Sequence, residues 1–145
     1  MAVWFSPNGG CEAQIVSTLG STTGPVYGLI FMYQSELIHN KLIAIKGLGR
    51  TVELIFDRRQ QFLAGPRIEE LLAAGIPCYY DKFERSVRSQ YLALSPRYVF
   101  AGSYIYTSQS ELRYAEILML SSVINDYNLT KANWDFHKAH SELIT

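Results

Sequence analysis

Few side chains in this sequence have types and spacing that could do chemistry by themselves. Cys11 and Cys78 are far apart, with neither a Cys-x-x-Cys spacing nor a histidine beside them, so a metal site is not indicated. His39 and Lys41 have a His-x-Lys spacing, but they lie in a predicted helix, and His137 lies in another. We interpret both histidines as surface residues, and we expect neither a metal nor any other cofactor.

The overall charge limits the classes of partner. Lysine and arginine together number 13, aspartate and glutamate also number 13, and the formal net charge is zero. A strong basic field over the whole molecule, which is typical of non-specific nucleic-acid binding, is therefore absent. Arg58 and Arg59 follow a predicted strand, where ligands often bind in α/β folds, but we interpret them as an ordinary solvated loop.

The first two thirds of the chain alternate between strand and helix patterns. Apolar runs predict buried strands, and apolar residues at helical spacing predict helices between them. Ser35 is a suitable N-cap for the second helix, and Pro66 opens the third. The predicted strands are 2–5, 25–33, 52–56 and 78–80, and the predicted helices are 11–20, a segment after Ser35 that ends at Gly47 or Gly49, and a segment from Pro66 to Gly75.

The last third predicts a cluster of strands and then a helix. The strand candidates are 91–94, 98–101 and 117–120, and the helix candidate is 123–140. This order predicts an α/β fold with a mixed, largely parallel sheet between helical layers. Without an internal repeat or a linker, residues 1–145 are expected to form one domain.

Several phrases, spread over essentially the whole chain, resemble the small bacterial nucleases of the phospholipase D superfamily. The most informative is Val99-Phe100-Ala101-Gly102-Ser103-Tyr104-Ile105, because family members carry a strand ending in Gly-Ser-x-Asn there. Glu116 falls where such nucleases have a glutamate. The resemblance implies a phospholipase D-like domain.

The family signature is His-x-Lys-x4-Asp, followed after a short strand by Gly-Ser. Counting back without gaps from Gly102 places the His position on Arg88, the Lys position on Gln90 and the Asp position on Ser95. The Asn of Gly-Ser-x-Asn is Ile105. Of the polar site positions, only Ser103 and Glu116 keep the family residue.

These replacements remove the chemistry that the resemblance implies. In the family, one histidine attacks phosphorus and a second protonates the leaving group, and small members obtain the second histidine by dimerising across a two-fold axis. Arg88 offers only donors, and Gln90 carries no charge. Both halves of a symmetric homodimer, which the resemblance also implies, would carry the same losses. We therefore expect a pseudoenzyme with no catalytic residue.

The replaced site could still bind a ligand without catalysing a reaction. Arg88, Gln90 and Ser103 could form an anion pocket, with Lys82 and Arg85 before it and two tyrosines, Tyr104 and Tyr106, that could stack on bases after it. The alternative is an internal ion pair between Arg88 and Glu116, which would leave Arg88 little attraction for phosphate.

Three functions remain open. The first is a catalytically inactive binding or regulatory module that acts through a protein partner, of the kind a phage or plasmid would encode. The second is a weak nucleic-acid binder that uses the degenerate groove. The third is a phosphodiesterase or nuclease with a rearranged site that uses His39, His137 or His140.

The chain shows no pattern that directs it to a membrane. Its longest apolar stretch, 26–33, is too short to cross one, and its N-terminus lacks a basic region followed by an apolar run. A cytoplasmic location without a membrane partner is the expectation.

Overall fold

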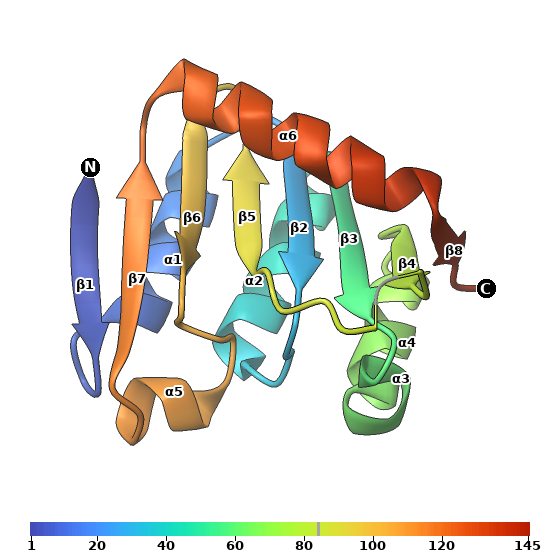
Figure 1. Cartoon of the computed structure of the whole chain (residues 1–145), viewed down its shortest axis with the longest axis horizontal. Coiled ribbons are helices and arrows are strands. Elements are labelled where there is room, and N and C mark those ends of the chain that lie inside the picture. Colours follow the sequence, from blue (N-terminus) through green and yellow to red (C-terminus); the bar gives the residue numbers. More distant parts are fainter. Residues whose placement is uncertain (84) are drawn as a thin grey trace.

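One mixed sheet organises the chain in the computed structural model, which describes residues 1–83 and 85–145. Within these residues the sheet has eight strands in the order β1-β7-β6-β5-β2-β3-β4-β8. The strands are β1 (Ala2–Ser6), β2 (Val26–Ile30), β3 (Val52–Asp57), β4 (Cys78–Asp81), β5 (Tyr91–Leu94), β6 (Tyr98–Gly102), β7 (Glu116–Ser121) and β8 (Ser141–Leu143) (Figure 1).

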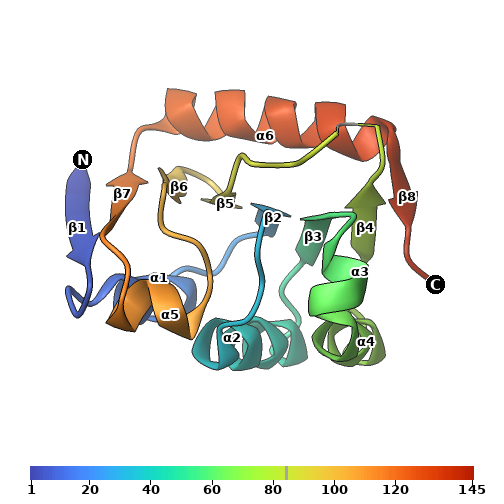
Figure 2. The same cartoon turned by 60° about the horizontal axis from the view of Figure 1, so that its bottom comes forward.

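Helices cover both faces of the sheet. Figure 2 shows α6 running across one face, from the β7 side to β8, while the other helices lie on the opposite face. The helices are α1 (Cys11–Ser21), α2 (Glu36–Gly47), α3 (Gln60–Leu63), α4 (Gly65–Ala73), α5 (Ser108–Leu112) and α6 (Ile124–Ala139). The predicted α/β class, with a mixed sheet between helical layers, is confirmed.

The prediction that the sheet is largely parallel is wrong. Only the β2–β3 and β3–β4 pairs are parallel among the described strands, and the remaining pairs are antiparallel. Parallel pairing requires a long crossover, and α2 supplies one from β2 to β3, as α3 and α4 do from β3 to β4. From β5 onward, β5 and β6 are joined by a short turn, which forces antiparallel pairing.

The sequence signals at helix starts have the expected physical effect. The Ser35 hydroxyl accepts a hydrogen bond from the Ile38 N–H at 3.2 Å and caps α2, and Pro66 lies in the first turn of α4. The short elements α3, α5 and β8 were not predicted. Each has five residues or fewer, too short to display a hydrophobic period.

The sheet has an apolar core on each face. The larger core packs α1, α2 and α4 against side chains such as Ile30, Leu54 and Phe56. The smaller core lies under α6 and centres on Trp134, which is 1% exposed and donates its ring N–H to the Gly28 carbonyl oxygen at 2.9 Å. Tyr27 packs on the same indole with its ring centroid 4.9 Å away. Trp134 is therefore the main attachment of α6 to the sheet.

Replacing Trp134 by alanine should lower the free energy of unfolding by about 3–5 kcal/mol, because it removes a large buried side chain and leaves a cavity. Urea denaturation followed by circular dichroism measures the change. Leu129→Ala is the control, since Leu129 lies on the same helix but is 65% exposed, and it should change stability by about 0.5 kcal/mol or less. Equal effects of the two substitutions would contradict this account of α6.

Candidate functional site

The topology gathers the predicted site residues at one edge of the sheet. β5 runs antiparallel to β2, so residues just before β5 lie beside the carboxyl end of β2. β6 runs antiparallel to β5, and β7 to β6, which brings the end of β6 and the start of β7 to the same edge. Arg88, Gln90, Gly102 and Glu116 all occupy such strand ends.

A hollow of about 380 Å³ opens at this edge. The residues that line it include every site residue predicted from the sequence except Ser95. They are Phe31, Arg88, Gln90, Gly102, Ser103, Ile105 and Glu116. Of the positions given by the gapless count back from Gly102, Arg88 and Gln90 lie at the same hollow as Ser103.

Ser95 lies apart from this hollow. It follows β5 at the opposite edge of the sheet, where its backbone N–H donates to the Pro25 carbonyl oxygen at 2.9 Å, just before β2. The grouping of Ser95 with the other positions is corrected here, because β5 crosses the sheet between Gln90 and Ser95.

Gln90 is fixed in place by its own carboxamide. Its Oε1 accepts hydrogen bonds from the backbone N–H groups of Phe31 at 3.0 Å and Met32 at 3.2 Å. Its Nε2 donates to the Tyr104 carbonyl oxygen at 3.2 Å, and the residue is 6% exposed. Gln90 thus joins the end of β2 to the loop after β6, so its side chain stabilises the fold.

The internal ion pair between Arg88 and Glu116 is not formed. Both residues line the same hollow, but no hydrogen bond or ion pair joins them in the part of the chain that the structure describes. Arg88 is exposed. Ser103 is exposed too, with its hydroxyl accepting a hydrogen bond from the Ile117 N–H at 3.0 Å. The guanidinium of Arg88 is therefore available to a ligand.

A second hollow, of about 610 Å³, adjoins the first through Arg88. Its lining residues are Arg59, Arg85, Ser86, Arg88 and Ser89. We name this group the arginine edge. Arg59, which the sequence pattern suggested was part of an ordinary solvated loop, belongs to it, and its guanidinium also lies 5.3 Å from the centre of the Phe31 ring.

The buried carboxylate of Asp57 holds the arginine edge together. Its Oδ1 accepts from the Arg59 Nε at 2.8 Å, and its Oδ2 accepts from the Val87 backbone N–H at 2.8 Å. Burial alone would raise the pKa of Asp57, but the hydrogen bonds from Arg59 and Val87 together lower it. An ionised Asp57 thus fixes the segment that carries Arg88.

The side chains of Tyr104 and Tyr106 do not reach the arginine edge. They are 2% and 1% exposed, inside the larger core. The prediction that they could stack on bases is wrong, because the chain after Gly102 turns inward and places both rings under the sheet.

One of the histidines lies elsewhere than the sequence suggested. His39 is 1% exposed, with Nδ1 2.9 Å from the Tyr33 hydroxyl and Nε2 2.7 Å from Glu70, so its interpretation as a surface residue is wrong. His137 is half-buried and lies with His140 beside Asp81. None of these histidines is among the described residues that line the two hollows at the arginine edge.

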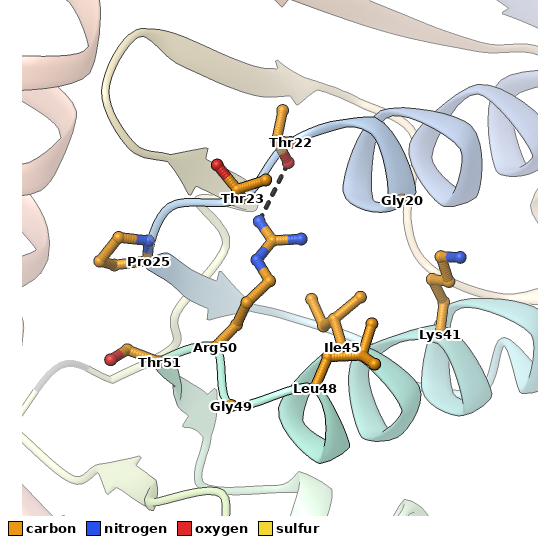
Figure 3. A pocket seen from close by; sticks show the side chains of 10 residues that line it. All are labelled: Gly20, Thr22, Thr23, Pro25, Lys41, Ile45, Leu48, Gly49, Arg50 and Thr51. Carbon is orange, nitrogen blue, oxygen red and sulfur yellow. Dashed lines mark hydrogen bonds between the residues drawn. The ribbon is translucent and has the colours of Figure 1, made fainter.

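A further hollow, of about 490 Å³, lies at the opposite edge of the sheet, near the starts of β2 and β3 (Figure 3). Figure 3 shows Arg50 pointing across it toward Thr22. The Arg50 guanidinium also donates to the carbonyl oxygens of Leu19 and Gly24. Because these groups follow or end α1, we interpret Arg50 as its C-terminal cap and this hollow as structural.

Comparison with known proteins finds similar curated sequences and similar solved structures. No family model matches the chain. A phospholipase D of Rickettsia conorii is 25% identical over 138 residues, which cover 93% of this chain and 68% of that protein. The crystal structure of Nuc from Salmonella typhimurium, a phospholipase D family member, superposes with a TM-score of 0.93 at 17% identity, over 99% of this chain and 96% of that one.

A second solved structure gives the same fold. NucT from Helicobacter pylori superposes with a TM-score of 0.82 at 11% identity, over 97% of this chain and 96% of that one. Among the described residues, no helix has both the length and the apolar character needed to span a bilayer.

The pH dependence of stability tests the role of Asp57. Its pKa is below the usual 3.8, so the stabilisation by the ionised carboxylate is complete above that pH and is lost as pH falls through the folded-state pKa. Asp57→Asn should lower the free energy of unfolding at neutral pH by about 1–3 kcal/mol, the usual cost of disrupting hydrogen bonds to a charged group.

Urea denaturation at neutral pH and at a pH below the lowered folded-state pKa of Asp57 measures both parts of this prediction. The effect of Asp57→Asn should shrink in acid, because the wild-type carboxyl is then protonated too. Asp135→Asn is the control, since the Asp135 side chain is 56% exposed and pairs only with Lys131 among the described residues. A destabilisation by Asp57→Asn that is independent of pH would contradict the assignment.

Proposed function

We propose that this chain, which has the phospholipase D superfamily fold, is a non-catalytic module that binds an anionic ligand at the arginine edge. The observation that carries the proposal is the exposed Arg88 between two hollows, which makes no ion pair with any residue that the structure describes. Arg85 and Arg59 line the second hollow with it. Guanidinium groups bind phosphate in a bidentate manner, so a phosphodiester backbone is the ligand class that this geometry favours.

The chemistry of the lining residues supports binding without cleavage. A nucleophile needs a lone pair, and the arginine at the expected histidine position has only donors. The residue at the expected lysine position, Gln90, is neutral and already makes three hydrogen bonds to backbone groups. A second copy of the chain would bring the same residues, so symmetric pairing would not restore a histidine.

A protein partner is the second candidate, favoured by exposed apolar side chains next to the first hollow. A shallow depression shares Ser103 and Glu116 with that hollow and extends to Phe5, which is 63% exposed. Leu112 and Tyr114 are 59% and 50% exposed. Apolar and aromatic side chains of this kind are enriched in protein interfaces. We propose that this surface mediates the homodimer that the family resemblance implies.

Binding of a fluorescent single-stranded oligonucleotide, followed by anisotropy at several salt concentrations, tests the first candidate. Arg88→Ala should weaken binding by roughly tenfold or more, because a hydrogen bond to a charged group contributes about 1.5–3 kcal/mol. It should also reduce the slope of log affinity against log salt by about 0.7, the value for one phosphate of a single strand.

Arg97→Ala is the matched control for this experiment. It removes the same charge, but Arg97 lies in the β5–β6 turn at the other edge of the sheet, so affinity should be nearly unchanged. The oligonucleotide should remain intact after incubation with the wild-type protein. Cleavage would contradict the non-catalytic proposal, and affinity insensitive to salt and to Arg88→Ala would exclude the arginine edge as the phosphate site.

Sedimentation equilibrium tests the proposed homodimer. The wild-type protein should be dimeric at micromolar concentration, and Phe5→Asp should shift it toward monomer by placing a charge in an apolar interface. Phe62→Asp is the control, since Phe62 is 82% exposed on α3, far along the sheet from β1. A monomeric wild-type protein would remove the homodimer from consideration.

A further inference from the structure

A cluster of metal-ligating side chains lies at the end of the sheet opposite to β1. Asp81 is the last residue of β4, His137 is in the last turn of α6, and His140 follows that helix. The Asp81 Oδ2 lies 2.8 Å from the His137 Nδ1 and 3.1 Å from the His140 Nε2. One ligand atom from each residue lies within 4.8 Å of the other two.

We propose that these three side chains bind one zinc-type divalent cation. Two imidazoles and one carboxylate form a donor set that zinc accepts in proteins. In a tetrahedral zinc site, bonds of about 2.0–2.1 Å place neighbouring ligand atoms about 3.3 Å apart. The two observed contacts are a few tenths of an ångström shorter, so small side-chain movements would admit the ion.

The surroundings of the three side chains orient them toward a common point. The Oδ1 of Asp81 accepts a hydrogen bond from the Phe83 N–H at 3.1 Å, which directs Oδ2 toward both rings. Phe83 packs on the ring of His140 with centroids 4.9 Å apart. Phe136 packs on both imidazoles, at 5.4 Å and 5.1 Å. Such surrounding contacts fix ligand orientation in metal sites.

Exposure at the cluster leaves room for a fourth ligand from solvent. The Asp81 side chain is fully buried, whereas the side chains of His137 and His140 are 13% and 20% exposed. A water molecule could therefore complete the coordination from the histidine side. The competing arrangement is a metal-free network in which both ring N–H groups donate to Asp81.

The bound ion would fasten three elements to one another. β8 begins at Ser141, directly after His140, and pairs antiparallel with β4, which ends at Asp81. A cation held by Asp81, His137 and His140 would therefore lock α6 and β8 onto β4. The cluster lies at β4 and β8, whereas residues next to β5, β6 and β7 line the first hollow, so the role of the ion does not depend on the anionic ligand proposed above.

Isothermal titration of the untagged, chelator-treated protein with Zn²⁺ tests this site. One equivalent should bind, and His137→Ala, His140→Ala and Asp81→Asn should each weaken binding by about tenfold or more, since losing even an outer partner of a metal ligand has an effect of that size. Asp135→Asn, a matched carboxylate change on an exposed part of α6, should leave the affinity unchanged.

The thiols should not compete for the ion. Cys11 and Cys78 are buried, and burial, with help from the charge of Glu111 at Cys11, raises their pKa values to about 11 and about 12. The proposal would be overturned if the wild-type protein bound no zinc, or if the His137→Ala and His140→Ala variants bound zinc as tightly as the wild type.

Nitrogen NMR of the histidine rings keeps the test decisive if those variants fail to fold. Zinc should shift the Nδ1 signal of His137 and the Nε2 signal of His140 in the wild-type protein, because those atoms face Asp81. The ring of His39, buried between Tyr33 and Glu70, should not respond. Unchanged signals from His137 and His140 in the presence of bound zinc would place the ion elsewhere and reject the site.

Discussion

The antiparallel pairing of β5 with β2 is the interaction on which the candidate site depends. It carries Arg88 and Gln90 to the carboxyl end of β2, and it sets the direction of β6 and β7, whose ends supply Ser103 and Glu116. Gln90 secures this junction, because its carboxamide bonds to backbone groups on both sides. A lysine there would present a charge to the hollow, whereas the amide contributes to the scaffold.

The fold of this chain depends on its apolar cores and strand pairings, and not on the exposed polar side chains that line the hollow. The fold superposes closely on that of Nuc, although only 17% of residues are identical. The apolar cores and the strand pairings account for that agreement, since they are indifferent to which polar side chain lines the hollow. Exposed polar residues at strand ends can therefore differ between proteins of this fold without a large cost in stability.

Local electrostatics, and not net charge, distinguish the surfaces of this molecule. The chain is neutral overall, yet Arg59, Arg85 and Arg88 gather at one place, where the buried Asp57 accepts hydrogen bonds from the backbone of Arg59 and of Val87. Further along the same edge of the sheet, Asp57 of β3 is paired in register with Asp81 of β4, which faces two histidines. The chain thus places the arginine edge, which is rich in hydrogen-bond donors, and a cluster of potential metal ligands at separate points of one sheet edge.

The sequence by itself determined the α/β class, the main elements and most of the positions at the hollow, although it grouped Ser95 with them and missed Phe31. Hydrophobic periods, capping residues and the Gly102-Ser103 phrase depend on neighbouring residues, so they can be recognised without the tertiary structure. The predominance of antiparallel pairs, the burial of His39 and the inward turn of Tyr104 and Tyr106 were decided only by tertiary structure. The meeting of Asp81 with His137 and His140 was decided in the same way, because β8 returns the end of the chain to β4 and no sequence spacing records that contact.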